Sequence, residues 1–255
     1  RAAQEAGLLG LSEKLRAYDS AKAAYRQSWS ERYRIIRIAW VALALSFALV
    51  TADLLHHLKG IPGHALHELD ELFMSVICVA LLRYYILGED AVAGRNVYFK
   101  VGRREIVYAL WTIGLNLLLW LAEKLAPDPK TLDIFSGLIV EYGVPLAGAI
   151  FLCILYLTWP YLAAAEKPAF SEFNDLNKAV NGSVESILVA LFYIFLPYSA
   201  ASFVYHHFFE DSKTSIPLLH YLRVYLMHVL FCICGIVEIS FMADVYKKLW
   251  LSRPG

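Results

Sequence analysis

Charged side chains within apolar stretches are the residues of this sequence best placed to do chemistry. Glu141 lies in SGLIVEYGVPLAGAIF, four residues before Pro145. Because proline has no N–H, the carbonyl of Glu141 loses its helical partner, and a free carbonyl then shares one turn with a carboxylate. An ionised carboxylate in lipid is costly unless it is paired, hydrated or protonated. We therefore expect Glu141 to face a bundle interior, where it either bonds a neighbouring Tyr or Arg or lines a path for ions or protons.

A polar stripe follows the last apolar stretch, residues 215–246. At about 100° per residue, one side of a helix collects His220, Arg223, His228, Cys234, Gly235 and Glu238. Such a stripe either meets complementary groups on other helices or lines water.

Arg83 is a further charge inside an apolar run, SVICVALLRYYIL. Its long side chain either reaches the membrane surface or forms an ion pair with Glu141 or Glu238. The sequence thus predicts a polar path for an ion or proton, built from Glu141, Glu238, Arg83, His228, Arg223 and His220.

Histidines gather with acids in DLLHHLKGIPGHALHELDE, residues 53–71. Imidazole and carboxylate ligands together suit Zn²⁺ or Cu²⁺, so His56, His57, His64 and His67 form a candidate metal site. The alternatives are pH sensing by histidine protonation and a plain polar loop. Haem ligated by two histidines is less favoured, because His228 has no second deep histidine as its partner. A quinone site at His220, with Tyr205 or Tyr221, has the same weak support.

The composition places the chain in a bilayer. Of 255 residues, 59% are hydrophobic and 18% are charged, which is too apolar for a soluble domain of this size. The zero net charge and the lack of any nucleic-acid motif exclude nucleic acid as a partner. No catalytic triad, HExxH motif, three-box histidine pattern or phosphate-binding loop is present, so an enzyme is disfavoured. The four cysteines lie in apolar runs without C-x-x-C spacing and are interpreted as small buried hydrophobes.

Six apolar stretches are long enough to cross a membrane as helices, which needs about 20 residues each. The stretches are 36–58, 70–88, 105–125, 132–163, 183–206 and 215–246. The predicted fold is therefore an all-α, polytopic membrane bundle with six transmembrane helices. Tyrosines within these stretches are expected to bond carbonyls freed by proline, such as the one that Pro197 leaves at Tyr193.

The distribution of positive charge predicts the orientation. Of the 23 Lys and Arg residues, 17 fall in the segments before, between and after the stretches on one side, and 4 fall on the other side. Such an excess places both termini in the cytoplasm. We expect a multi-pass protein of the inner (plasma) membrane that works as a homo-oligomer or as a subunit of a membrane complex.

Residues 1–30 are predicted to form a separate amphipathic helix, followed by a transmembrane domain over 31–255. The apolar stripe of this helix contains Leu8, Leu11, Leu15, Tyr18, Tyr25 and Trp29. The helix either lies on the inner membrane surface, with its cations on anionic headgroups, or packs against a copy of itself or a partner. Ser28 and Glu31 match a capping box that would start a new helix. Because the chain starts at Arg1 rather than Met, we expect its natural start to be missing.

Two functions from different classes fit these features. The first is a channel or carrier subunit with a polar path through the second, fourth and sixth spans. The second is a non-catalytic or redox subunit of a larger complex, which binds metal, haem or quinone near the outer side.

Overall fold

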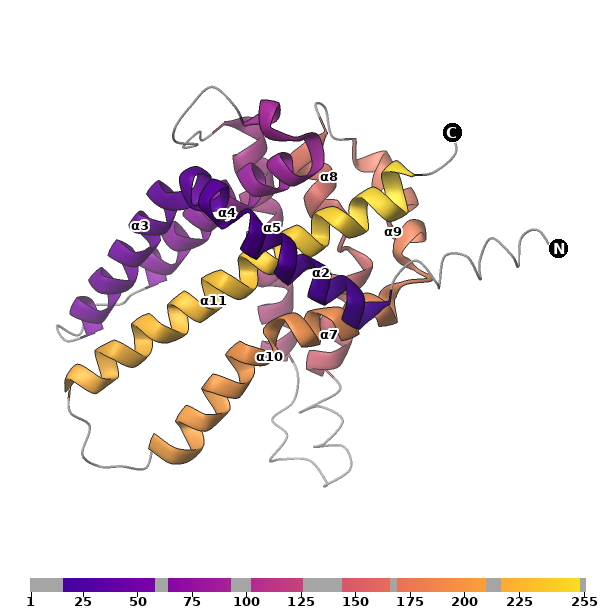
Figure 1. The fold of residues 1–255 in the computed structure, drawn as a ribbon. Coiled ribbons are helices and arrows are strands. Elements are labelled where there is room, and N and C mark those ends of the chain that lie inside the picture. The colour runs from indigo at the N-terminus through magenta and orange to yellow at the C-terminus, as the bar shows by residue number, and fades with distance from the viewer. Residues whose placement is uncertain are drawn as a thin grey trace, which may run out of the picture.

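The chain folds entirely into helices over the residues that the computed structural model describes, which are 16–57, 64–92, 102–125, 144–165, 169–209 and 217–252 (Figure 1). The long helices are α3 (Arg32–His57), α4 (His64–Leu87), α5 (Arg103–Leu125), α10 (Val184–Phe209) and α11 (Pro217–Tyr246). The shorter helices are α2 (Ala17–Ser30), η1 (Glu89–Ala91), α7 (Val144–Ile154), α8 (Thr158–Ala164), η4 (Phe170–Glu172), α9 (Phe173–Val180) and η5 (Lys247–Leu251). The all-α prediction is therefore confirmed for the described residues.

Four helical stretches in the described part of the chain are long and apolar enough to cross a membrane. They are Arg32–Ala52, Leu146–Ala164, Val184–Val204 and Leu222–Leu251. The helix α4 contributes a shorter apolar segment, Phe73–Leu87, and α5 follows the third predicted stretch without meeting the same criterion. These apolar helices fit a multi-pass membrane protein.

The helices α4 and α11 form the centre of the molecule. α4 contacts α3, α5, α8 and α11, and α11 also contacts α10 and α2. Between Ser75 and Tyr85, α4 is buried on nearly all sides, and the part of α11 from Val237 to Tyr246 is almost as enclosed. A helix that is apolar all round belongs in the middle of a bundle, so the other helices are arranged around this pair.

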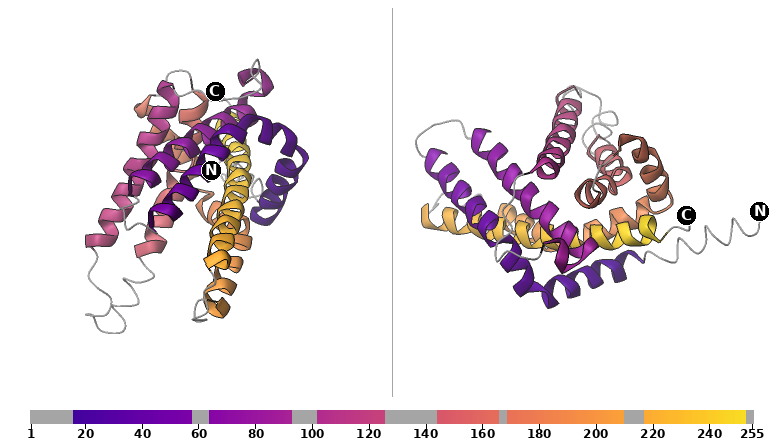
Figure 2. Two further views of the ribbon diagram at one scale, coloured as in Figure 1. Left: turned by 90° about the vertical axis from the view of Figure 1, so that its left-hand side faces the viewer. Right: turned by 90° about the horizontal axis from the view of Figure 1, so that it is seen from above.

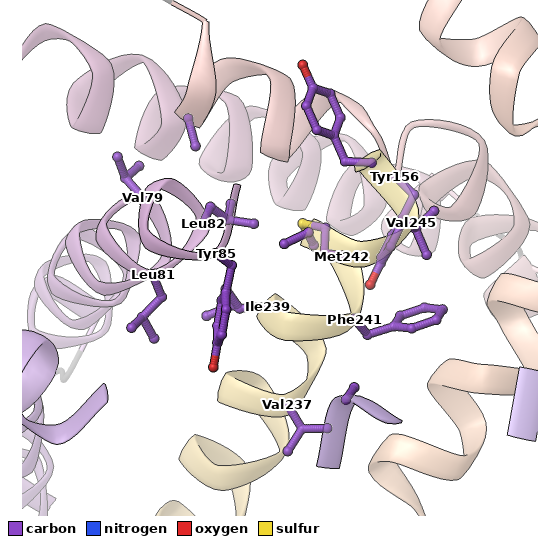
Figure 3. Packing of buried hydrophobic residues seen from close by; sticks show 14 of the residues in the cluster. Val79, Leu81, Leu82, Tyr85, Tyr156, Val237, Ile239, Phe241, Met242 and Val245 are labelled. Carbon is purple, nitrogen blue, oxygen red and sulfur yellow. The ribbon is translucent and has the colours of Figure 1, made fainter. Parts of the chain in front are cut away.

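Figure 3 shows how the central pair packs. Leu82 and Tyr85 of α4 lie beside Ile239 and Met242 of α11, and Phe241 fills the space on the other side of α11. The side chains of Leu81, Leu82 and Phe241 are completely buried. The tightest packing lies toward the C-terminal ends of α4 and α11. By contrast, the C-terminal half of α10 and the N-terminal half of α11 expose large apolar side chains such as Phe203 and Leu222. Such exposure is expected where helices face lipid.

The fourth predicted stretch is not one continuous helix. α7 ends at Ile154, and the turn over 155–157 is held by two short-range hydrogen bonds: the amide of Tyr156 donates to the Cys153 carbonyl at 3.2 Å, and that of Thr158 donates to the Leu155 carbonyl at 2.9 Å. Pro160 explains the break, because it cannot donate to the carbonyl of Tyr156 and its ring displaces that carbonyl. Sequence analysis placed the irregularity near Pro145, which here lies in the first turn of α7, where proline is tolerated.

The helix α2 lies on the outside of the bundle (Figure 2) and packs against α10 and α11. Its buried face consists of small residues, namely Ser20, Ala21, Ala24 and Ser28. The predicted apolar stripe takes part in this contact only in part: Tyr18 and Tyr25 reach α10, whereas Trp29 is 71% exposed and the leucines of the stripe lie outside the described residues. Small side chains let two helices approach closely, and Trp29 is left on the open side.

Two tyrosines fix α2 to the proline-containing turn of α10. The hydroxyl of Tyr25 donates to the carbonyl of Ile194 at 2.6 Å, and the rings of Tyr18 and Tyr193 meet edge to face at 5.5 Å. Burial raises the pKa of Tyr25 to about 12, so the phenol keeps its donor proton at neutral pH. Pro197 leaves the Tyr193 carbonyl without a helical donor, and the tyrosine from α2 bonds the next carbonyl along the chain.

The predicted capping box is wrong. Ser28 lies inside α2, which continues to Ser30, and its hydroxyl bonds nothing in the described part of the chain. The helix boundary falls at Glu31, a single turn residue before α3 begins at Arg32. The side chain of Ser28 is buried against the bundle and does not turn back to cap α3.

We expect truncation of Phe241 to destabilise the whole bundle. Phe241→Ala removes a completely buried side chain from the central pair, and such changes cost about 3–5 kcal/mol in folded cores. The matched control is Phe192→Ala on α10, whose ring is 64% exposed. Thermal unfolding in detergent should show a clear loss of stability for the first variant alone, and equal losses for both would contradict the central role of this pair.

Candidate functional site

Polar and ionisable side chains form two clusters along the central helix pair. We name the first the His228 cluster; it consists of Ser46 and Thr51 from α3, Asp70 from α4, and Tyr225, His228 and Cys232 from α11. We name the second the Glu238 cluster; it consists of Cys78 from α4, Tyr108 from α5, Cys153 from α7, Tyr156 from the turn that follows α7, and Glu238 from α11.

In the His228 cluster, the imidazole bonds across the helix interface. Its Nε2 atom lies 3.0 Å from the hydroxyl oxygen of Ser46 and 3.7 Å from the thiol sulfur of Cys232. The ring also meets Phe47 edge to face, with centroids 4.8 Å apart. Histidine is thereby held in one orientation, with a hydroxyl and a thiol at the same nitrogen.

Asp70 adds a carboxyl group to this cluster. It interacts electrostatically with both His228 and Cys232, and its Oδ1 atom is buried without a hydrogen-bond partner in the described residues. One turn before His228 on α11, the hydroxyls of Tyr225 and Thr51 lie 2.7 Å apart. A buried, unpaired carboxyl oxygen is costly, which marks this position as one where water or a bound ion would be stabilised.

The Glu238 cluster encloses a carboxyl group among phenols and thiols. Glu238 interacts electrostatically with Tyr108, Tyr156, Cys78 and Cys153. Tyr156 is buried, and its hydroxyl lacks a hydrogen-bond partner among the described residues. Glu238 itself keeps a minor part of its surface accessible. The site therefore combines a carboxyl group with an unpaired hydroxyl, and within the described part of the chain it contains no cation.

The two clusters are stacked along the same pair of helices. His228 and Glu238 are ten residues apart on α11, and Asp70 and Cys78 are eight residues apart on α4, which correspond to rises of about 15 Å and 12 Å. Ser75, which is buried on α4, lies between the two levels. Ionisable groups are thus distributed over much of one helix–helix interface. The gap between the His228 cluster and the Glu238 cluster is too long for direct proton transfer.

The structure does not bring the predicted path residues into one group. His228 lies in one cluster and Glu238 in the other, about 15 Å apart along α11. Arg83 donates to the carbonyl of Ala163 at 3.3 Å, and the proposed pair with Glu238 is absent from the described part of the chain. Arg223 is partly buried and engages a neighbouring group.

Several predicted site residues lie outside the part of the chain that the structure describes. Glu141 is one of them. The side chains of His56, His57, His64, His67 and His220 also lie outside the described part, although their helices are described. Among the side chains that are described, no group of three or more His, Cys, Asp and Glu residues is arranged to hold a metal ion.

Of each cluster, sequence reasoning selected a single residue as part of a polar path, His228 in one and Glu238 in the other. Ser46 and Thr51 gave no signal, because isolated hydroxyl residues are ordinary in membrane helices. Asp70 was grouped with the outer acids, and the cysteines were interpreted as small hydrophobes. Helical periodicity shows which residues of α11 share a face and says nothing about the neighbouring helix, and a role of His228 and Glu238 in a path stays a prediction.

The chain matches no family model, no curated protein and no solved structure. The two clusters are therefore the basis on which a function can be assigned.

The hydrogen bond between Ser46 and His228 should be measurable as a coupling free energy. In a double-mutant cycle of Ser46→Ala and His228→Phe, we expect about 0.6 kcal/mol of coupling in thermal unfolding, the average for hydrogen bonds between membrane helices. The control cycle uses Thr112→Ala in place of Ser46→Ala. The Thr112 hydroxyl accepts a hydrogen bond from Trp159 and does not belong to the His228 cluster. Coupling of equal size in both cycles would show that His228 has no specific bond to Ser46.

Proposed function

We propose that this protein is a transport-class membrane protein, a channel or carrier subunit that moves protons or small ions between α4 and α11. The observation that carries the proposal is the stack of two ionisable clusters at one helix interface, each with a buried polar atom that lacks a partner in the described residues. In a membrane interior, unpaired polar atoms are expensive and mark ion and proton pathways.

The chemistry of the clusters suits a proton better than a bulky solute. Imidazole and carboxyl groups exchange protons readily, while the surrounding phenols and thiols donate hydrogen bonds without adding fixed charge. The gap between the clusters, about 12–15 Å along the helices, requires water to complete the path. A proton would then move from Asp70 and His228 to Glu238 through water held near Ser75 and Cys232.

We further propose that all six predicted stretches cross the inner (plasma) membrane and that both termini are cytoplasmic. α4 packs against α3, and only a short segment connects the two helices. α4 would therefore return through the membrane beside α3. α5 in turn packs against α4 and α8. The excess of Lys and Arg on one side supports the orientation. In this arrangement the Glu238 cluster is nearer the cytoplasmic side and the His228 cluster is nearer the outer side.

Cysteine labelling tests this topology. In a background with all four native cysteines replaced, Leu125→Cys at the exposed end of α5 should react with a membrane-impermeant maleimide added outside intact cells. Ser171→Cys, which is exposed in η4, should react after the membrane is opened and not before. Labelling of Ser171→Cys in intact cells would reverse the orientation, and labelling of both would contradict the six-span arrangement.

Proton flux in liposomes tests the function. With an enclosed pH-sensitive dye and an imposed potential, the purified protein should conduct protons, and Glu238→Gln should lower the rate about tenfold or more, equivalent to a barrier rise of about 1.4 kcal/mol. Glutamine keeps the shape of the side chain and removes the exchangeable acid. His228→Phe should also lower the rate, because it interrupts the other cluster.

The control for charge removal is Glu185→Gln at the first turn of α10, which lies in neither cluster and should conduct as the parent does. Each variant is first checked for an unchanged unfolding temperature and elution volume, so that a loss of flux is not a loss of fold. Parent-like flux in both Glu238→Gln and His228→Phe, or no flux of any ion by the parent, would overturn the proposal.

A further inference from the structure

A groove lies where the C-terminal half of α2, the first turns of α3 and the middle of α11 meet. It has a volume of about 550 Å³, which is within the range of roughly 300–1,000 Å³ typical of ligand sites. Its walls are formed by Tyr25, Arg26, Ser28, Trp29, Ser30, Arg32, Ile35, Ile36, Ile233, Ile236 and Val237. We call it the α2–α11 groove.

The groove has an apolar wall and a cationic rim. The isoleucines of α3 and α11 supply the wall, and Ile36 and Ile233 remain about half exposed. The rim contains Arg26 and Arg32, and none of the described residues that line the groove is acidic. An apolar surface of this kind next to two guanidinium groups matches a molecule with an acyl chain and an anionic head.

The two arginines differ in how they are held. Arg32 donates to the carbonyl of Trp29 at 2.9 Å, and its guanidinium lies over the rings of Trp29 at 5.0 Å and Tyr33 at 4.5 Å. This stacking leaves further N–H groups of the fork open. Arg26 is exposed and makes no ion pair or hydrogen bond with any described residue. Both arginines can therefore bind an anion without losing a bond that they already make.

Ser28 closes the inner side of the groove. Its side chain is 7% exposed, and its hydroxyl oxygen is buried near the hydroxyl of Tyr85 on α4. The hydroxyl is therefore turned toward the bundle, and the surface that the groove offers to a ligand is apolar except at the two arginines of the rim.

We propose that the α2–α11 groove binds an anionic phospholipid, with its phosphate at Arg26 and Arg32 and an acyl chain along the isoleucines of α3 and α11. The location supports a lipid, because α3 begins its apolar span beside the groove, at the depth where headgroups meet acyl chains. The lipid then joins α2 to the two membrane helices on which it rests.

Fluorescence quenching by brominated lipids tests the site. The protein is placed in vesicles of one fixed composition of phosphatidylglycerol and phosphatidylcholine, in which either the anionic or the neutral lipid carries the brominated chains. Subtracting the signal of Trp29→Phe isolates the emission of Trp29. We expect brominated phosphatidylglycerol to quench Trp29 more strongly than brominated phosphatidylcholine.

Removal of the rim charges should abolish this preference. In Arg26→Gln/Arg32→Gln, the ratio of the two quenching efficiencies should approach one. Each removed cation should lower the preference for the anionic lipid by up to about fivefold. Arg16→Gln/Lys22→Gln is the matched control, because it removes the same charge from the same end of the chain away from the groove and should keep the preference. Ser30→Phe, at an exposed position of the rim, should reduce the preference with every charge retained.

Three results would contradict a lipid site in the groove. Equal quenching of Trp29 by both lipids in the parent would overturn the proposal, as would an equal loss of preference in the control variant, which would indicate a general surface charge. Shielding of Trp29 from both lipids, with a change of oligomeric state in Ser30→Phe, would assign the groove to a second copy of the chain. Because the assay measures no flux, its result is independent of the transport proposal.

Discussion

The close packing of α4 against α11 is the constraint on which the rest of the structure depends. In a membrane, helices gain little from the hydrophobic effect, because lipid is as apolar as their side chains; association depends on shape and on interhelical hydrogen bonds. α4 and α11 meet this requirement with completely buried Leu81, Leu82 and Phe241. Every other long helix packs against at least one of these two helices or bonds to it, so the pair fixes the positions of the polar groups that it carries.

The same packing explains how ionisable residues are kept inside the bundle. His228 bonds Ser46 across the interface, and Glu238 lies among hydroxyl and thiol groups from three other segments. None of these neighbours in the described part of the chain neutralises the acid with a positive charge. A carboxylate in an ion pair is held in its charged form, whereas a carboxyl group without a cationic partner can gain and lose a proton.

The helix α2 presents two different faces. Its small residues and Tyr25 pack on the bundle, while Trp29 and Arg26 are exposed. The turn at Pro197 receives the tyrosines of α2, so a proline that weakens one helix provides the attachment point for another. The groove at the other end of this contact lies between α2 and two membrane helices, where a lipid would stabilise all three elements together.

The sequence by itself determined the class of the fold and the approximate extent of each long helix, because the length and apolarity of a stretch depend on local composition alone. It also predicted that His228 and Glu238 share one face of the last helix, since a helical period of 3.6 residues shows which side chains lie on the same side.

Tertiary structure decided the rest. The partners Ser46, Asp70, Tyr108 and Tyr156 come from other helices, and no periodicity within one helix specifies its neighbour. The face of α2 that docks was also decided by packing, because close approach favours small side chains such as Ala24 over the larger aromatic residues. The sequence indicates a helix break in the fourth stretch, but it contains two prolines, Pro145 and Pro160, at which the break could occur. The contacts of α7 and α8 with α4, α5 and α10 determined that the chain bends before Pro160.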